Sequence, residues 1–425
     1  MTSAHRADSA AGTIIWRSPF LRAACAALFI SGIGVSATTP QMTLFLVNDL
    51  DASVPVAGLY YLVNLAAPIA GYWLGSLSDR QPDRLRLFRI CAVVGGVGWL
   101  AMGLATAVWM PFVIGALALS ISGGSMGLLF AAVRDELSRT ASPAADRVIS
   151  AVRMAFTAGW ILGPVVGSWF GAVYGLRPLL LATAALTVGQ IVPLGFQRVA
   201  RYVSPSRTAP IDDGPSDGAA FGVAAGSAAV RPPGESRLPL FVFVGCCVLV
   251  MHSDTIKFAY LPLYMANQLG VSDTLRGAVI AIQPLAELAL MPLFARLADR
   301  ITPIRVVTLG AAFGVAANLA YATSEHVLGL FVGQLLMSCL WAAIAGLGVT
   351  VAQQLYPSGV GLASSVFMSS IMLGGGLGGA IGGLGTALLG VPHVFYISAA
   401  LGLVGAVGMA VVGRRYRPGA AAFAA

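Results

Sequence analysis

The sequence is short of charged residues. Only 10% of its 425 residues are Asp, Glu, Lys or Arg, whereas 57% are hydrophobic. Soluble domains carry about 25% charged residues, so this scarcity excludes an ordinary soluble globular protein. The five cysteines lie in apolar stretches without metal-ligand spacing, so we expect no disulfide framework, no metal site and no cofactor. Lysine occurs once, as Lys257, in a chain with 24 arginines.

Long apolar segments are abundant instead. Segments of about 20 residues recur along the chain, and each is long enough to cross a bilayer as a helix. Their apolar runs are continuous rather than alternating, which favours helices over a barrel. The sequence therefore predicts an all-α membrane protein with 12 transmembrane helices in two six-helix bundles. The expected spans are 20–47, 54–77, 87–108, 111–133, 148–172, 177–197, 238–268, 274–296, 303–323, 327–352, 358–387 and 391–413.

The two sets of six spans are separated by residues 198–237, which are rich in Pro, Gly, Ala and Ser. Such a composition is typical of a flexible linker. A Leu-x-Asp-Arg segment follows the second span of each set, with Asp79 and Asp299 220 residues apart, which indicates an internal repeat of the kind found in secondary transporters. The predicted domains are an N-terminal tail 1–19, a first bundle 20–197, the linker 198–237, a second bundle 238–413 and a C-terminal tail 414–425.

The net charge of +8 has a topological explanation. If both termini are cytoplasmic, 22 of the 25 basic residues lie in the tails, the linker and the loops on that side. This asymmetry follows the positive-inside rule, so we expect both termini in the cytoplasm. The positive charge then reflects how the protein is oriented in the lipid bilayer, which we expect as its partner. We do not expect nucleic acid as a partner.

The segment GSLSDRQPDRLR (residues 75–86) lies in the predicted loop between the second and third spans. Its G-x-L-x-D-R pattern resembles a motif of the major facilitator superfamily, and the resemblance covers nearly the whole chain outside the linker and tails. It implies the major facilitator fold and a latch that closes the cytoplasmic side by charge pairing. A solvated basic loop that serves topology alone is the alternative. The residues expected in this gate are Gly75, Asp79, Arg80, Arg84, Asp299 and Arg300.

The fifth span reads RMAFTAGWILGPVVGSWFG and carries the G-x-x-x-G-P-x-x-G pattern that this superfamily associates with export. We expect a helix bend there. The residues concerned are Gly159, Gly163, Pro164 and Gly167. Segments such as YYLVNLAAPIAG and LPLYMANQLGVSD resemble the bacterial sugar efflux transporter family. This narrower resemblance implies export of small sugars or glycoside-like solutes across a bacterial inner membrane, and we expect a monomer.

Asp254 lies near the middle of the seventh span, about 24 Å from one end and about 21 Å from the other at 1.5 Å per residue, and Lys257 follows three positions later. Residues three positions apart share a helix face, so the two charges can pair. Ionisable groups at this depth usually face a water-filled cavity. The pair is therefore a candidate for substrate binding and proton coupling, and a structural ion pair that fixes helix packing is the alternative.

Glu287 is a carboxylate deep in the eighth span, with Gln283 one turn before it. We expect Glu287 to carry a proton or to bind sugar, and a polar contact between helices is the alternative. Arg153 begins the fifth span, where an arginine that reaches back to the interface is the alternative to substrate binding. The other candidates are neutral polar or aromatic side chains suited to a sugar, with hydrogen bonding between helices as the alternative. They are Gln41, Tyr60, Tyr61, Asn64, Asn318, Gln334, Trp341, Gln353 and Gln354.

These features predict a secondary active exporter that moves a small molecule by alternating access, driven by an inward flow of protons. Two alternatives stay open: a multidrug or metabolite exporter of the same superfamily, and a membrane sensor that binds ligand without moving it. We do not expect an enzyme, because His252 has no candidate nucleophile beyond the adjacent Ser253.

Overall fold

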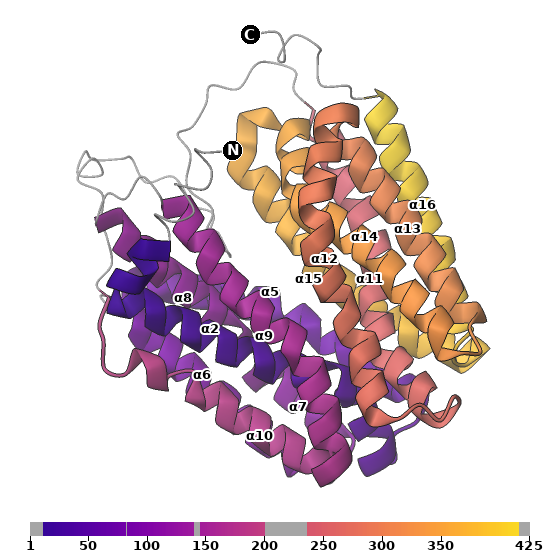
Figure 1. Ribbon diagram of the computed structural model, residues 1–425, viewed down its shortest axis with the longest axis horizontal. Coiled ribbons are helices and arrows are strands. Elements are labelled where there is room, and N and C mark those ends of the chain that lie inside the picture. Colours follow the sequence, from indigo (N-terminus) through magenta and orange to yellow (C-terminus); the bar gives the residue numbers. More distant parts are fainter. Residues whose placement is uncertain (1–11, 82, 140–144, 200–235, 416–425) are drawn as a thin grey trace. The chain divides into compact units, whose positions relative to one another are not determined.

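The computed structural model describes residues 12–81, 83–139, 145–199 and 236–415 (Figure 1). The predicted tails and linker fall largely outside these residues. Within the described part, 12 helical segments are long and apolar enough to cross a membrane, which confirms the predicted all-α membrane class. They are Pro19–Asp49, Val54–Ser78, Arg84–Gly103, Trp109–Arg139, Ala151–Tyr174, Leu176–Leu194, Leu238–Asn267, Asp273–Ile301, Pro303–Thr323, Val327–Leu355, Pro357–Leu389 and Val394–Arg415.

The chain forms two compact units. The first consists of Met1–Thr38 and Ala66–Gly222, drawn mainly in indigo to magenta in Figure 1. Its helices are α2 (Pro19–Thr38), α5 (Ala67–Arg80), α6 (Arg84–Gly103), α7 (Trp109–Ile114), η4 (Gly115–Leu119), α8 (Ser120–Arg139), α9 (Ala145–Tyr174), α10 (Leu176–Gly189) and η5 (Val192–Leu194).

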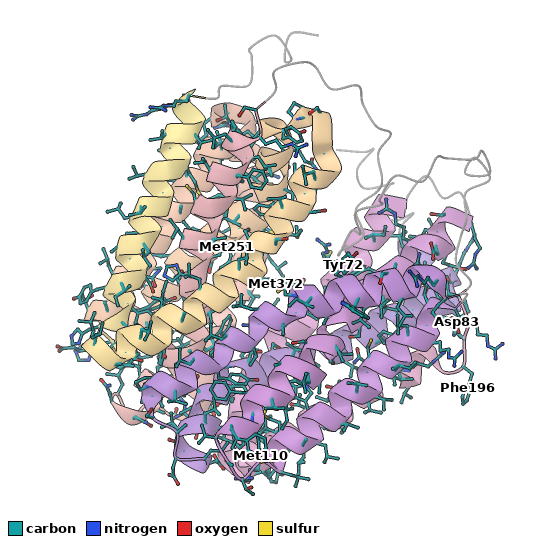
Figure 2. All side chains as sticks on the ribbon, turned by 180° about the vertical axis from the view of Figure 1, so that it is seen from behind. Tyr72, Asp83, Met110, Phe196, Met251 and Met372 are labelled. Atoms are coloured by element: carbon teal, nitrogen blue, oxygen red, sulfur yellow. The ribbon has the colours of Figure 1, made fainter. Side chains whose placement is uncertain are left out.

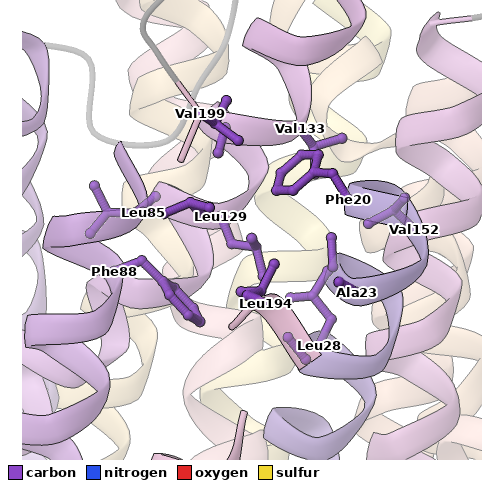
Figure 3. Close-up of a cluster of buried hydrophobic side chains, with 14 of the residues drawn as sticks. Phe20, Ala23, Leu28, Leu85, Phe88, Leu129, Val133, Val152, Leu194 and Val199 are labelled. Atoms are coloured by element: carbon purple, nitrogen blue, oxygen red, sulfur yellow. The ribbon is translucent and has the colours of Figure 1, made fainter. Parts of the chain in front are cut away.

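The hydrophobic core of the first unit gathers at one end of its helices (Figure 3). Phe20 and Leu28 enter it from the start of α2, Phe88 from the start of α6 and Val133 from the end of α8. All of these side chains are buried. Since an apolar residue gains little by leaving lipid, close packing rather than water exclusion is what fixes such a core in a bilayer.

Helices α2 and α9 of the first unit meet backbone to backbone. A Cβ atom added at Gly163 of α9 would lie 2.8 Å from the backbone nitrogen of Ala37 and 2.8 Å from the carbonyl oxygen of Ile33. The hydroxyl of Ser36, which lies in this seam, donates to the carbonyl oxygen of Gly32 at 2.8 Å and also lies 3.4 Å from the carbonyl oxygen of Gly159 on α9. Small residues allow this approach, which is a common way for membrane helices to associate.

The second unit consists of Thr39–Leu65 and Val223–Ala425. Its helices are η1 (Thr39–Gln41), α3 (Met42–Leu44), η2 (Phe45–Asp49), α4 (Val54–Leu59), η3 (Tyr60–Ala66), α11 (Leu238–Asn267), α12 (Asp273–Ile301), α13 (Pro303–Thr323), α14 (Val327–Leu355), η7 (Pro357–Gly359), α15 (Val360–Leu389) and α16 (Val394–Arg415). The grouping by contact thus differs from the predicted division by chain order at residues 39–65, and that division stays a prediction.

The glycine-rich helix α15 explains this grouping. On one face, Gly374 packs against Met251 of α11, which is labelled in Figure 2. On another face, a Cβ at Gly379 would lie 2.8 Å from the backbone nitrogen of Leu62. Gly383 likewise lies against the carbonyl oxygen of Pro55, at 2.9 Å from the position of an added Cβ. Glycine therefore lets α15 touch α11 and the segment 54–65 at once.

Candidate functional site

Asp254 and Lys257 form an ion pair in the interior of α11. The Lys257 ammonium donates to Asp254 Oδ1 at 2.5 Å. The side chain of Lys257 is 1% exposed and that of Asp254 is 19% exposed, so the carboxylate is the accessible member of the pair. Lys257 also lies 4.1 Å from the centre of the Phe258 ring, where a cation is attracted by the aromatic face.

Two further helices bring polar groups to this pair. Gln283 of α12 accepts a hydrogen bond from the Lys257 ammonium through its side-chain oxygen. The indole nitrogen of Trp341, on α14, donates to Asp254 Oδ1 at 3.1 Å. We call Asp254, Lys257, Gln283 and Trp341 the polar cluster. All four were candidates from the sequence, and the structure brings them into contact.

Within the described residues, all the hydrogen bonds of the Asp254 carboxylate go to Oδ1. Its second oxygen, Oδ2, accepts none from the described residues. An ionised carboxylate can accept about four hydrogen bonds, so the polar cluster keeps acceptor capacity for another molecule. Lys257, in contrast, has both a carboxylate and an amide partner, which stabilise its charge away from water.

Glu287 lies one helical turn beyond Gln283 on α12 and is half-buried. It lies within electrostatic range of both Asp254 and Lys257. The three charges therefore form one group with two carboxylates and one ammonium. No group of three or more His, Cys, Asp or Glu suited to a metal ion occurs among the described residues.

A second layer of polar side chains supports the polar cluster. The sequence analysis named Gln334 of this layer as a candidate and missed Ser338 and Tyr321. Ser338 of α14 is buried and donates to the backbone oxygens of Gln283 and Gln334, at 3.1 and 2.8 Å. Tyr321 of α13 donates to the side-chain oxygen of Gln334 at 3.1 Å. Ser338 lies one turn before Trp341, and this helical spacing is the only signal in the sequence that could have identified it.

The remaining candidates in the second unit do not join the polar cluster. Asn318 is buried on α13, and its amide nitrogen donates to Gly314 of the same helix at 2.8 Å. Tyr61 donates to the Thr39 carbonyl oxygen at 3.3 Å, and Gln41 is buried in η1. These contacts resemble the helix packing that the sequence left open as their alternative role.

Asn64 lies beside α15. A Cβ added at Gly375 would lie 3.4 Å from the Asn64 amide nitrogen and 3.6 Å from the Thr255 hydroxyl oxygen. Thr255 follows Asp254 on α11, so Gly375 keeps open the space between Asn64 and a neighbour of the polar cluster. Arg153 belongs to the first unit, where its exposed guanidinium lies 5.7 Å from the centre of the Phe130 ring.

The gate residues differ between the two copies of the motif. In the first unit, Arg84 forms an ion pair with Asp135 of α8 and donates to the Ser78 hydroxyl at 2.8 Å. Asp135 was not among the predicted residues, although it lies in the stretch RDEL. The side chain of Asp79 lies outside the described part of the chain. Three other predicted gate residues are exposed and form no ion pair that the described residues include: Arg80, Asp299 and Arg300.

The export motif lies in the seam between α2 and α9. Gly159 packs against the α2 backbone, with an added Cβ 2.9 Å from the Ile33 nitrogen, and Gly167 packs against Ala37. Helix α9 runs without interruption from Ala145 to Tyr174 through Pro164. Close helix approach is therefore a role of the glycines that the structure supports, and a bend used during transport stays a prediction.

Comparison with known proteins identifies the family of the chain. The family model described as the Major Facilitator Superfamily matches residues 24–255 and 242–424. The chain belongs to the major facilitator superfamily. It is a multi-pass membrane transporter and not an enzyme, as the sequence predicted.

Relatives of the chain include proteins named as sugar efflux transporters and proteins named as multidrug resistance proteins. Sugar efflux transporter A of Escherichia coli K12 is 25% identical over 379 residues, which cover 88% of this chain and 92% of the relative. The multidrug resistance protein MdtG of Rahnella sp. is 26% identical, with 81% of each chain covered. The crystal structure of the nucleoside transporter NupG superposes with a TM-score of 0.72 at 16% identity, covering 94% of this chain and all of NupG, and this likeness concerns the fold alone.

Proposed function

We propose that this protein is a secondary active exporter of small sugars or glycoside-like solutes, coupled to inward proton movement. The observation that carries the proposal is the polar cluster itself. Helices α11, α12 and α14 bring together an ion pair, an amide and an indole, and Asp254 lies about 20 Å from the nearer end of α11. Ionisable groups at this depth in a membrane protein usually mark a substrate or ion pathway.

A sugar fits the chemistry of this cluster. Sugar hydroxyls need acceptors, and Asp254 Oδ2 is available as one within the described residues. Trp341 supplies an aromatic ring next to that carboxylate, and aromatic faces pack well against sugar rings. The names of the sugar efflux relatives favour the same substrate class.

Proton coupling follows from the balance of charge. Asp254, Glu287 and Lys257 together carry one spare negative charge when all three are ionised. An uncompensated charge at bilayer depth is costly, so binding of one proton would stabilise this group. In the proposed cycle Glu287 takes up the proton and Asp254 binds the substrate. We further propose that the protein acts as a monomer in a bacterial inner membrane, with both termini in the cytoplasm.

The test is transport in proteoliposomes with an imposed pH gradient, using radiolabelled sugars and cationic dyes. Wild-type protein should move sugar in response to the gradient. Asp254→Asn should lose sugar movement altogether, whereas Glu287→Gln should keep sugar exchange but lose the response to the gradient. Glu325→Gln is the matched control, because Glu325 is an exposed carboxylate between α13 and α14.

Three results would contradict the proposal. Sugar movement that ignores the gradient in wild type would remove proton coupling. Gradient-driven movement of dyes but not of sugars would favour the second candidate, multidrug export, which rests on the similarity to MdtG. Ligand binding without any flux would favour a membrane sensor.

A further inference from the structure

A cavity of about 310 Å³ lies in the second unit, away from the polar cluster. It is lined by the first turns of α13 and the last turns of α16. Its lining residues are Arg305, Thr308, Ala410, Gly413 and Arg414. The size is at the lower end of the range for sites that bind small molecules. None of these residues is part of the proposed transport site.

The cavity is suited to an anion. Arg305 and Arg414 supply two guanidinium groups, and no carboxylate of the described residues lines the cavity. Neither arginine forms an ion pair with a described residue. Arginine matches phosphate oxygens with paired N–H donors, which makes it well suited to phosphate recognition. The backbone N–H groups at the start of α13 lie at the same end of this helix as Arg305, and they add to the positive potential there.

The surroundings of the cavity favour a lipid as the source of the phosphate. Ala410 and Gly413 form an apolar, narrow wall, and an added Cβ on Gly413 would lie 3.3 Å from the Ile304 side chain. On the same two helices, large apolar side chains are exposed at Val411, at the level of the cavity, and at Leu309 and Val407, farther toward the middle. A headgroup in the cavity could therefore continue into acyl chains along this surface, whereas a free phosphate ion has no use for it.

We propose that this cavity binds the phosphate group of an anionic phospholipid. Basic pockets between transmembrane helices are known to hold such headgroups. The lipid would join the start of α13 to the end of α16 through its phosphate, and it would hold this end of the second unit together.

Native mass spectrometry of the full chain, released from detergent with defined lipids, tests the proposal. Arg305→Gln/Arg414→Gln should lower retention of phosphatidylglycerol about tenfold or more, since each basic group near an anionic lipid contributes about 1 kcal/mol. Arg296→Gln/Arg415→Gln is the matched control, because it removes one exposed arginine in the last two turns of α12 and another at the end of α16, both outside the lining. The control should retain the lipid. Arg305→Lys/Arg414→Lys should also retain it, because the charge is kept.

Two further arms distinguish the source of the phosphate and guard against misfolding. Inorganic phosphate and phosphatidylcholine are added in place of phosphatidylglycerol, and thermal unfolding is followed in each case. Protection by phosphatidylglycerol alone supports an anionic lipid site. Equal protection by inorganic phosphate would overturn the lipid assignment, and equal loss of lipid in the pocket and control variants would overturn the site. Unchanged elution on size exclusion confirms that the pocket variant is folded.

Discussion

The two units use polar residues at different depths of their helices. In the first unit the described ion pairs lie near helix ends, as with Arg84 and Asp135, and mid-helix contacts are made by glycine and hydroxyl groups such as Gly163 and Ser36. In the second unit an ion pair, Asp254 with Lys257, lies in the middle of α11. The first unit is therefore built for close helix packing at mid-depth, and the second unit holds the charged groups there.

Removing the carboxylate of the polar cluster should have the largest effect. Asp254→Asn leaves Lys257 buried without its counter-charge, and breaking a buried pair in this way costs about 3–5 kcal/mol. We expect this cost to appear in thermal unfolding, and we expect the folded fraction to lose sugar flux altogether, because the amide no longer supplies the charged acceptor for the sugar. Flux per folded transporter in proteoliposomes is the measurement.

A double variant separates function from structure at this site. Asp254→Asn/Lys257→Met removes both charges, so it should recover thermal stability and yield without recovering flux. Recovery of at least half of the wild-type flux would mean that the pair only fixes helix packing, and the difference between the units would then have no functional meaning.

A methyl group in the α2–α9 seam should have the next largest effect. Gly163→Ala places a Cβ against the Ala37 and Ile33 backbones, and overpacking of this kind costs about 1–3 kcal/mol. The matched control is Gly127→Ala on α8, where an added Cβ meets nothing within 4 Å. Because alanine favours helix by about 1 kcal/mol over glycine, the control should gain stability while the seam variant loses it. Thermal unfolding in detergent gives both values, and parallel shifts would refute close packing as the role of Gly163.

How far the sequence predicts the molecule differs between the fold and the site. The spans follow from hydrophobicity and length, and the sequence found all of them because a bilayer imposes those two requirements directly. Asp254, Lys257 and Glu287 became candidates because a charge in an apolar run stands out. Ser338 and Asp135 were missed, since one is a common small residue and the other lies at a helix end where charge is ordinary. Which side chains of neighbouring helices meet depends on how each helix is rotated about its own axis. Hydrophobicity does not determine that rotation in a helix that is apolar on all sides.

Removing one hydrogen bond from the polar cluster should have a smaller effect. Trp341→Phe keeps an aromatic ring but loses the N–H that donates to Asp254 at 3.1 Å. A hydrogen bond to a charged group contributes about 1.5–3 kcal/mol, so the sugar concentration for half-maximal flux should rise about tenfold. Trp109→Phe is the control, because that indole is 65% exposed on α7 in the first unit. Equal changes in the two variants would mean that Trp341 acts through general packing.

Variants of the two copies of the Asp-Arg motif should have the smallest effects on transport. They nevertheless give the most direct comparison between the units. Arg84 and Asp135 are 12% and 13% exposed, so their ion pair is partly shielded from water, whereas Arg300 is exposed. Arg84→Gln should slow transport about threefold to fivefold, in line with a pair worth about 1 kcal/mol, while Arg300→Gln should stay within about twofold of wild type. Adding Asp135→Asn to Arg84→Gln should cause little further loss, because both changes break the same contact. Additive losses in that double variant would show that Arg84 acts through a partner other than Asp135. A larger loss at Arg300 than at Arg84 would show that the motif in the second unit works without an ion pair of the Arg84–Asp135 kind.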